Sequence, residues 1–566
     1  MSNADRRGLG SPHWWCALPD VAAAGPAAAA LSTVGVVAAR HPSGRPWLVT
    51  AAQAPPPHIV GGGARAVAVL GAAVSAELRV TRKRSQCEVQ QWARQTGSAH
   101  VVTSEPGGRV CAVADAAGFR RVFTAVAGGV AVAASHAEIL RRLIGAPVDR
   151  AWVAAKLASP EMPSVLRQAR SPFVGVSPVP AGCVAELEGH TVRVRPWWGP
   201  PEPQLSLSEG AQLLRDALTR AVRGRADHGA GPVSVQLSGG LDSAAIALLA
   251  AESAPLLVTT AGASPVDDDL AWARRVAHEI AGGEHRVLGV GETPPLFAEL
   301  DRAVAGMDEP CSFAAGAARQ RHAAAVLAER GVALHANGQG GDEVLLAPWA
   351  FLPGLLHQQP RRGWRQLRGF AALRGLRVCS VLRAAMAPPV SFARWLDGAR
   401  AGLRREVTGP AAALGWEAPP LLPEWASDEA AALAATAIAE AAPSPLHHDV
   451  AVHAALTRIR ASAYRAALYA DAMAAAGVPT VMPFFDHDVL TACLSTRADH
   501  RTDPWTPKPL LRQAFPEWEG LLARRTKGHY NTDIYRGLEQ PEGPGARSAR
   551  RLAAGRARPH RAPHAA

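Results

Sequence analysis

Residues 233–250 carry the pattern with the clearest chemistry in this chain and read VSVQLSGGLDSAAIALLA. An apolar run of strand type ends at Leu237, and helix-forming residues begin at Ala244. Between them, Gly239 and Gly240 lack a Cβ, so the turn can be tight and its N–H groups can approach a ligand. The N-terminus of the next helix adds unpaired donors and the positive end of a dipole. This pattern is typical of a loop that binds phosphate or pyrophosphate.

Asp242 lies in this loop, and a carboxylate beside bound phosphates is repelled unless a cation lies between them. We therefore interpret Asp242 as a ligand of Mg²⁺. A second glycine-rich loop, NGQGGDE at 337–343, follows the apolar run 332–336. If both loops follow neighbouring strands, Asp242 and Asp342 can bind one Mg²⁺. For the second loop alone, an ordinary turn in which Asp342 caps a helix is an equally good interpretation.

The elements around the two loops predict a parallel sheet. Runs of strand type at 256–260 and 286–290 alternate with helical patterns, one of them at 271–280. Strands and helices that alternate at this spacing form a doubly wound α/β sheet, in which ligands bind at the carboxyl ends of the strands. Ser206 and Glu209 predict a capping box at the start of the helix before the first loop.

The rest of the sequence predicts a β-rich domain before the parallel sheet and a mainly helical region after it. Short Val-rich runs between residues 31 and 196 predict a β-sandwich with some helices. Trp197 and Trp198, before a Pro-rich segment, predict a domain boundary at which the two rings pack. The pattern after residue 343 is mainly helical. The expected parts are an N-terminal extension at 1–30, a β-rich domain at 31–200, an α/β domain with helical C-terminal part at 205–540 and a disordered basic tail at 541–566.

Composition narrows the class of protein. The formal net charge is +12, but residues 546–566 carry six arginines and no acid, so half of the net charge belongs to the tail. No aromatic and basic surface for stacking nucleotides is evident. The uncharged stretch 21–39 is mostly alanine and contains Gly and Pro, which disfavours a membrane anchor. The seven cysteines form no C-x-x-C pair, as is typical of a reducing compartment, and we expect a cytoplasmic protein.

Six motifs of the chain resemble, in their order and context, those of the asparagine synthetase family. They are SGGLDS from residue 238, DEP from 308, GQGGDE from 338, PFFDHDV from 483, KPLLR from 508 and RTKG from 525. SGGLDS by itself resembles the pyrophosphate loop of ATP pyrophosphatases. The resemblance covers nearly the whole chain and implies an ATP-dependent carbon–nitrogen ligase that forms AMP and pyrophosphate, with ATP and Mg²⁺ as cofactors. It also implies that the front domain is of the glutaminase (Ntn) type.

The resemblance also implies roles for single residues. Lys527 would contact the α-phosphate and stabilise the transition states, with Asp242 and Asp342 holding Mg²⁺ for the reaction. The residues that would bind ATP are Leu237, Ser238, Gly239, Gly240, Leu241, Asp242, Ser243, Thr260, Asn337 and Gly338.

Gln339 departs from the family pattern. Small-molecule members have Glu or Tyr at this position, the Tyr serving in a dyad that deprotonates the amine, and glutamine cannot accept a proton. Two explanations stay open. Either Tyr464, Asp486 or His487 acts as the base, or an α-amine enters already neutral, which its pKa of about 8 allows.

The front domain departs from a working glutaminase, in which the mature chain begins with a cysteine nucleophile. The α-amine of that cysteine is the base for its thiol, whereas the first cysteine here is Cys16, inside the expected extension. We therefore do not expect glutamine hydrolysis. Family members without this cysteine include β-lactam synthetases and lasso peptide cyclases, in which an amine of the substrate replaces ammonia. The segments HPSGRPWLV, GVSPVPAG, RPWW, KPLLRQAF and RRTKG look most like those of lasso peptide cyclases.

This likeness implies a macrolactam synthetase. With ATP, it would activate an Asp or Glu side chain of a ribosomal core peptide, and the N-terminal amine of the peptide would close an isopeptide bond. The implied partners are the precursor peptide, a leader peptidase and a leader-recognition protein, with no membrane and no nucleic acid. Three alternatives stay open: a small-molecule amide or β-lactam synthetase, a tRNA-modifying ATP pyrophosphatase that uses the basic tail, and a non-catalytic scaffold.

Overall fold

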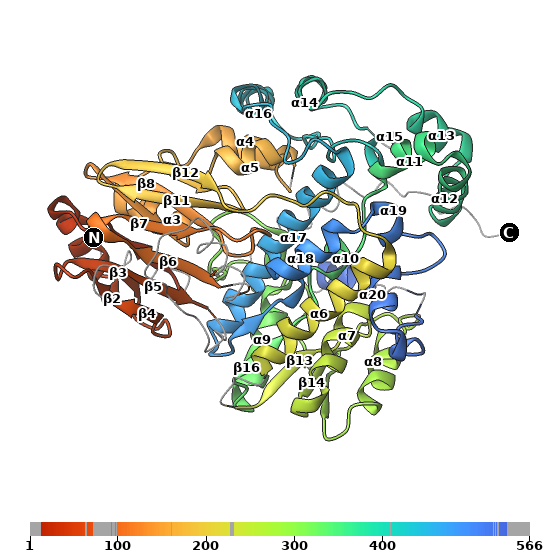
Figure 1. Ribbon diagram of the computed structural model, residues 1–566, viewed down its shortest axis with the longest axis horizontal. Coiled ribbons are helices and arrows are strands. Elements are labelled where there is room, and N and C mark those ends of the chain that lie inside the picture. Colours follow the sequence, from red (N-terminus) through yellow and green to blue (C-terminus); the bar gives the residue numbers. More distant parts are fainter. Residues whose placement is uncertain are drawn as a thin grey trace.

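The computed structural model describes residues 13–62, 65–71, 92, 97, 99–159, 161–226, 231–407, 409–524, 526, 528 and 531–539. These residues form a β-sandwich, a parallel sheet flanked by helices, and a mainly helical part (Figure 1). The expected fold class, an α/β protein with a β-sandwich followed by a doubly wound parallel sheet and a helical part, is confirmed.

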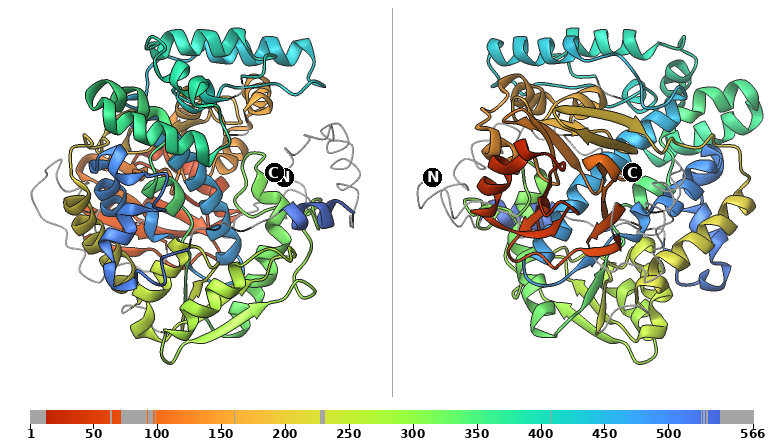
Figure 2. Two further views of the ribbon diagram at one scale, coloured as in Figure 1. Left: turned by 90° about the vertical axis from the view of Figure 1, so that its right-hand side faces the viewer. Right: turned by 60° about the vertical axis from the view of Figure 1, so that its left-hand side comes forward.

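The β-sandwich is made of two antiparallel sheets. The first has the order β10-β8-β9-β1-β3-β2, with the bounds β10 Ser177–Val179, β8 Val122–Ala127, β9 Val130–Ala134, β1 Trp15–Ala17, β3 Pro46–Ala51 and β2 Gly35–Arg40. The second has the order β12-β11-β7-β6-β5-β4, with the bounds β12 Thr191–Pro196, β11 Cys183–Glu188, β7 Val110–Val113, β6 His100–Ser104, β5 Arg65–Leu70 and β4 His58–Gly62. Trp15, Trp47 and Val102 belong to the core between the sheets. Helices α1 (Gly25–Ser32) and α3 (Ala137–Ile144) pack on the first sheet (Figure 2).

Strand β1 corrects the expected domain boundary. The sequence predicts an extension at 1–30, whereas β1 lies inside the first sheet and pairs with β3 and β9. Trp15 is opposite Thr50 in one pairing, and Cys16 is opposite Ala134 in the other. A strand of three residues is too short to show the alternation by which strands are found in a sequence. The sandwich therefore begins before residue 31.

The third sheet is entirely parallel and has the order β15-β14-β13-β16-β17. Its strands are β13 Val233–Gln236, β14 Leu256–Thr260, β15 Glu284–Leu288, β16 Leu334–Ala336 and β17 Thr480–Val481. The accompanying helices are α6 Leu207–Ala226, α7 Leu241–Leu249, α8 Asp269–His278 and α9 Ala317–Glu329. The capping box before α6 is confirmed, since the Ser206 N–H donates to Glu209 at 2.9 Å. Because β14 and β16 lie on opposite sides of β13, the strand order reverses there, and α/β sheets bind ligands at the carboxyl ends of strands at such a point.

The long helix α17 (Val450–Ala474) lies between the sandwich and the parallel sheet (Figure 1), and the chain forms a further set of helices. They are α4 Arg150–Ala158, α5 Ser164–Ala169, α10 Gly341–Leu345, α11 Leu352–Gln358, α12 Pro360–Leu373, α13 Val378–Ala385, α14 Phe392–Ala401, α15 Pro410–Ala413, α16 Asp428–Glu440, α18 His487–Ser495, α19 Ala498–Arg501, α20 Pro509–Ala514 and α21 Asn531–Glu539. Among the described residues, none of the helices has the length and hydropathy that a membrane crossing requires.

The sandwich and the parallel-sheet domain share a packed interface. Val101 and Val113 of the second antiparallel sheet belong to the same apolar core as Leu214 of α6. Trp197 is buried, its indole N–H donates to the carbonyl of the front domain at residue 114 over 2.9 Å, and its ring stacks on His487 at 5.6 Å. The prediction that Trp197 packs between the domains is confirmed.

Candidate active site

The two glycine-rich loops lie side by side. They leave β13 and β16, which are neighbours in the parallel sheet, at 238–243 and 337–343. A Cβ on Gly338 would come within 2.8 Å of the backbone of the first loop, and a Cβ on Gly341 would overlap the carboxyl group of Asp242. Glycine is needed at both positions because the two loops are in contact.

The first loop is braced from within. The Ser243 hydroxyl accepts a hydrogen bond from the Ser238 N–H at 3.1 Å and donates one to the Gly240 carbonyl at 3.0 Å. Gly239 has a φ of 79°, in the left-handed region that favours glycine. Leu237, before the loop, is fully buried and donates its N–H to β14 at 2.8 Å. The turn is therefore preformed, as a pyrophosphate-binding loop needs to be.

Lys508 brings the two predicted carboxylates together, although its residue type and loop context gave it no role in the sequence analysis. Its Nζ contacts Asp342 Oδ1 at 2.8 Å and also forms an ion pair with Asp242. Lys508 is 8% exposed and has a φ of 48°, a left-handed conformation that is strained for a lysine before Pro509. The only sequence signal for this residue was its place in the KPLLR motif.

The three groups shift one another's protonation. Burial raises the pKa of Asp242 to about 6, a rise to which Asp342 adds and which Lys508 opposes. Burial lowers the pKa of Lys508, but the two carboxylates outweigh it and hold that pKa above its ordinary value. Lys508 is therefore a fixed ammonium group at neutral pH, and Asp242 becomes a stable anion only when positive charge is near.

The carboxylates fit the Mg²⁺ that the motifs imply. Asp242 Oδ1 is buried and has no hydrogen-bond partner among the described residues. A buried carboxylate oxygen without a partner is costly, and Mg²⁺ prefers such oxygens as ligands. Asp242 and Asp342 are the residues that would hold the ion.

Lys527 lies outside the described residues, but its neighbours are placed. Arg524 is 3% exposed and donates to the Gly239 carbonyl at 2.9 Å. Its guanidinium also pairs with Asp268 at 2.6 Å, and the Thr526 hydroxyl donates to the same carboxylate at 2.6 Å. Arg524 is thus anchored against the 238–243 loop.

The residues predicted to line the adenosine follow the same edge of the sheet. Thr260 ends β14, on one side of β13, and Asn337 and Gly338 follow β16 on the other side. The Asn337 side chain accepts a hydrogen bond from the Gln339 N–H at 2.9 Å, which fixes the start of the second loop. The structure places these residues at one edge of the sheet, on the two sides of β13, and their contact with adenosine stays a prediction.

The three open candidates for a general base are engaged elsewhere. Asp486 forms an ion pair with Arg225 at 2.6 Å, and His487 is stacked on the interdomain tryptophan. The Tyr464 hydroxyl donates to the Glu309 carbonyl at 3.4 Å, and burial raises the pKa of this tyrosine well above its ordinary value. None of the three makes a described contact with the two carboxylates or with Lys508.

The described cysteines of the front domain are poor nucleophiles. Cys16 is fully buried, and burial raises the pKa of its thiol to about 12. Burial likewise raises the pKa of Cys111 to about 11 and raises that of Cys183. Cys87 lies outside the described residues. Because the thiolate is the reactive form, the three described thiols are inert near neutral pH.

Comparison with known proteins identifies the family of this chain. The sequence profile described as Asparagine synthase matches residues 213–557. The chain belongs to the asparagine synthase family. Members of this family are ATP-dependent ligases that make carbon–nitrogen bonds. No curated protein sequence matches this family member.

Two solved structures are similar to this asparagine synthase family member at 10% sequence identity. One is glutamine phosphoribosylpyrophosphate amidotransferase from B. subtilis complexed with ADP and GMP, which covers 54% of this chain and 80% of its own, with a TM-score of 0.20. The other is described as the allosteric regulatory enzyme of purine biosynthesis and covers 54% of this chain and 79% of its own, with a TM-score of 0.21.

Proposed function

We propose that this family member is an ATP-dependent macrolactam synthetase that adenylates an Asp or Glu side chain of a ribosomal core peptide and joins it to the peptide's N-terminal amine. The observation that supports ATP chemistry best is the convergence of Asp242 and Asp342 on Lys508 beside the 238–243 loop. The buried thiol of Cys16 supports an amine that comes from the substrate instead of glutamine. The lasso-type segments of the sequence favour a peptide as substrate.

Each group near the loops has a task in the adenylation step. The 238–243 loop would bind the pyrophosphate portion of ATP, and Lys508 would offset its charge and that of the two carboxylates. A bound Mg²⁺ would neutralise phosphate charge while the peptide carboxylate attacks the α-phosphorus. A bond forms from the carboxylate oxygen to that phosphorus, and pyrophosphate leaves. Lys527 would stabilise the charge on the α-phosphate.

Ring closure needs placement more than a strong base. The amine nitrogen attacks the acyl carbon, the C–O bond to AMP breaks, and the nitrogen gives up one proton to the phosphate of the departing AMP or to water. Gln339 cannot take that proton, and the three candidate bases are engaged elsewhere. An α-amine with a pKa of about 8 is neutral in a useful fraction at physiological pH. We therefore infer that the enzyme selects the neutral amine and holds the folded peptide in a near-attack arrangement.

Mass spectrometry of a co-expressed precursor peptide and its peptidase, with and without this protein, tests the proposal. A product lighter by one water, about 18 Da, is expected only when the protein is present. Asp242→Asn, Asp342→Asn and Lys527→Met should each abolish the product, whereas Asp397→Asn, at an exposed acid of α14, should not. Full turnover by any of the first three variants would remove that residue from the mechanism.

The same experiment addresses the substrate class. If the peptide stays linear while free amino acids stimulate formation of AMP and pyrophosphate, the protein is a small-molecule amide or β-lactam synthetase. A leader peptidase and a leader-recognition protein are proposed partners, because the amine that closes the ring must first be freed from a leader.

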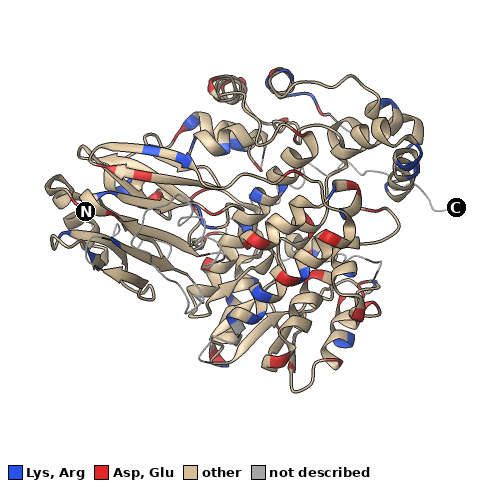
Figure 3. Cartoon of the chain, in the orientation of Figure 1, with Lys and Arg blue, Asp and Glu red and all other residues tan. Residues whose placement is uncertain are grey.

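One observation favours a second candidate, the tRNA-modifying ATP pyrophosphatase. Helix α12 presents Arg361, Arg365 and Arg368 beside Trp364, which is 41% exposed, and Arg365 lies over the ring of Trp505 at 4.5 Å. The sequence predicts no such aromatic and basic surface, because Trp364 and Trp505 are far apart along the chain. In Figure 3 the positions of Asp and Glu are mixed among those of Lys and Arg over much of the chain.

RNA binding measured over a salt series decides this second candidate. If the surface binds RNA, Trp364→Ala combined with Arg365→Ala should weaken binding and flatten its salt dependence. Equal, weak binding by the variant and the wild type would remove the candidate.

A further inference from the structure

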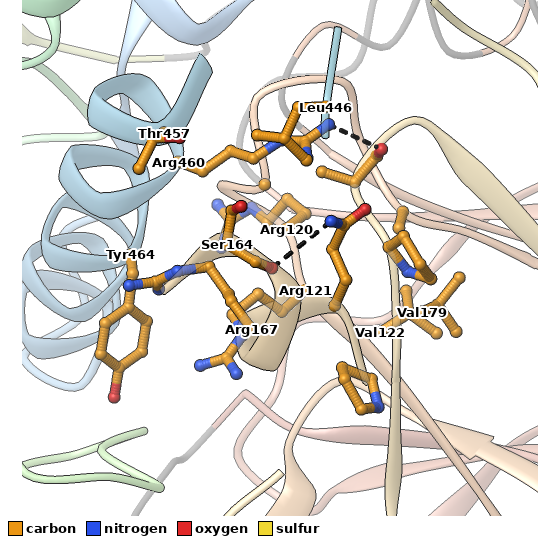
Figure 4. Close-up of a pocket in the computed structure, with 16 residues that line it drawn as sticks. Arg120, Arg121, Val122, Ser164, Arg167, Val179, Leu446, Thr457, Arg460 and Tyr464 are labelled. Carbon is orange, nitrogen blue, oxygen red and sulfur yellow. Dashed lines mark hydrogen bonds between the residues drawn. The ribbon is translucent and has the colours of Figure 1, made fainter. Parts of the chain in front are cut away.

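A small cavity between the β-sandwich and α17 is lined by four arginines. Its volume is about 50 Å³, and its arginines are Arg120, Arg121, Arg167 and Arg460 (Figure 4). They come from the front domain and from α17, and no acidic residue lines the cavity. The cavity shares no lining residue with the loops of the candidate active site.

We call this cavity the arginine pocket. Neighbouring carboxylates neutralise only part of the positive charge of its four arginines. Glu309 pairs with Arg121 at 2.9 Å and with Lys156 at 3.6 Å, and it is also the carboxylate whose charge acts most strongly on Arg167. Arg460 donates to a main-chain carbonyl at 3.1 Å and forms no ion pair among the described residues. Burial lowers the pKa of Arg460 to about 10, which still leaves it charged at neutral pH.

Two buried polar groups of the pocket have no partner. The Nε of Arg460 and the hydroxyl of Ser164 are buried and make no hydrogen bond with described residues. Ser164 is 4% exposed, and both residues line the cavity. Unmet buried donors are costly, and the four guanidinium groups outnumber their ion-pair partners, which are Glu309 on Arg121 and Asp471 on Arg120 at 3.8 Å. An anion with several acceptor oxygens would satisfy both needs at once.

We propose that the arginine pocket binds the oxyanion group of a ligand, a carboxylate or a phosphate. A space of about 50 Å³ suits a group of this size. A second cavity of about 640 Å³ shares Arg120, Arg121 and Tyr464 with the pocket, so the two cavities are adjacent. Two sources offer this chemistry: free phosphate, and the C-terminal carboxylate of a peptide. The peptide source rests on the proposed function, and the phosphate source does not.

Calorimetric titration of the full chain with inorganic phosphate tests the site. Arg460→Met should weaken phosphate binding about tenfold, because it removes a charge-assisted donor and keeps the length of the side chain. Arg458→Met is the matched control, since Arg458 is exposed on the same helix and should leave binding unchanged. The difference between the two variants separates this pocket from the loop at 238–243, which also suits phosphate. Ser164→Ala is a milder change that should weaken binding a few-fold without loss of the fold.

A second titration separates the two sources. A core peptide with a free C-terminal carboxylate is compared with the same peptide as its amide. Tighter binding of the acid, with the preference lost in Arg460→Met, assigns the pocket to the peptide. Equal binding of acid and amide, with phosphate binding lost in Arg460→Met, assigns it to phosphate. Phosphate and acid-peptide binding that stay at wild-type strength in Arg460→Met and in Ser164→Ala would overturn the proposal, whatever the outcome of the ring-closure assay.

Discussion

Lys508 holds two carboxylates that would otherwise repel each other at the carboxyl edge of the parallel sheet. It is buried with Asp242 and Asp342, and its backbone is kept in a left-handed conformation that a residue before proline avoids. Strain of this kind persists only where the surroundings over-determine it, which is common in active sites. We therefore regard Lys508 as part of the ATP-binding machinery and not as a solvated loop residue.

Lys508→Met should reduce ATP–pyrophosphate exchange by about 100-fold or more. The change removes the cation that offsets both carboxylates and leaves them buried without it. Exchange is measured at saturating Mg²⁺, so that a loss reflects more than weaker metal binding. Arg512→Met, one turn along α20 in an exposed pair with Glu519, is the control and should retain full exchange. Exchange near the wild-type rate in Lys508→Met would contradict a role for this lysine.

Gly341→Ala tests whether the two loops must touch. A Cβ at this position would overlap the carboxyl group of Asp242, so the loops have to separate. We expect a loss of about 1–3 kcal/mol in the free energy of unfolding and a weaker apparent affinity for Mg²⁺. Denaturation in urea and Mg²⁺ titrations of the exchange activity measure the two effects. Gly354→Ala in α11, where a Cβ meets nothing within 4 Å, should be neutral or slightly stabilising.

At the scale of single elements, β16 contributes a buried histidine directly before the second loop. His335 is fully buried, lies 2.8 Å from the Ser234 hydroxyl of β13 and 3.2 Å from the Tyr469 hydroxyl of α17, and so ties three elements together. Burial lowers the pKa of His335 to about 3. The histidine must therefore stay neutral for these elements to pack.

This pKa predicts how β16 responds to acid. The unfolded chain takes up the proton near pH 6.5, so the stability that neutral His335 contributes is complete above that pH and is lost as the pH falls toward 3. The slope is about 1.4 kcal/mol per pH unit. His335→Asn should flatten the fall in the free energy of unfolding between pH 6 and pH 4, measured by urea denaturation. His278→Asn, at an exposed position of α8, should not flatten it, and identical profiles for wild type and His335→Asn would contradict the prediction.

The strands of the parallel sheet show which elements can be predicted from the sequence and which cannot. The expected strand at 256–260 matches β14, and the neighbouring strands were found within a few residues of their bounds. Their apolar runs and the glycine loops after them are local signals. β1 and β17 were missed because strands of three and two residues have no readable period, and tertiary pairing alone defines them. The role of Lys508 was also missed, because only the fold shows that this lysine meets two carboxylates from loops that are distant in the sequence.

At the scale of the whole molecule, the front domain is a structural partner of the ligase domain. Its second sheet shares an apolar core with α6, and Arg121 crosses the interface to Glu309 at 2.9 Å. The arginine pocket and the larger cavity both lie where the sandwich meets α17. A domain that has no reactive described cysteine still shapes this interface by packing against the ligase domain.

Cys16→Ala distinguishes a structural front domain from a catalytic one. Cys16 packs in the core between the first sheet and its helices, so removing the thiol should cost about 1 kcal/mol of unfolding free energy. The amount of dehydrated peptide formed per folded enzyme should stay at the wild-type level, with or without glutamine, because the amine comes from the peptide. Urea denaturation and mass spectrometry of the product provide the two measurements, with the exposed Cys379→Ala as the control. A folded Cys16→Ala variant that has lost a glutamine-dependent activity of the wild type would show that the thiol is catalytic, despite its burial, and that ammonia is the nucleophile.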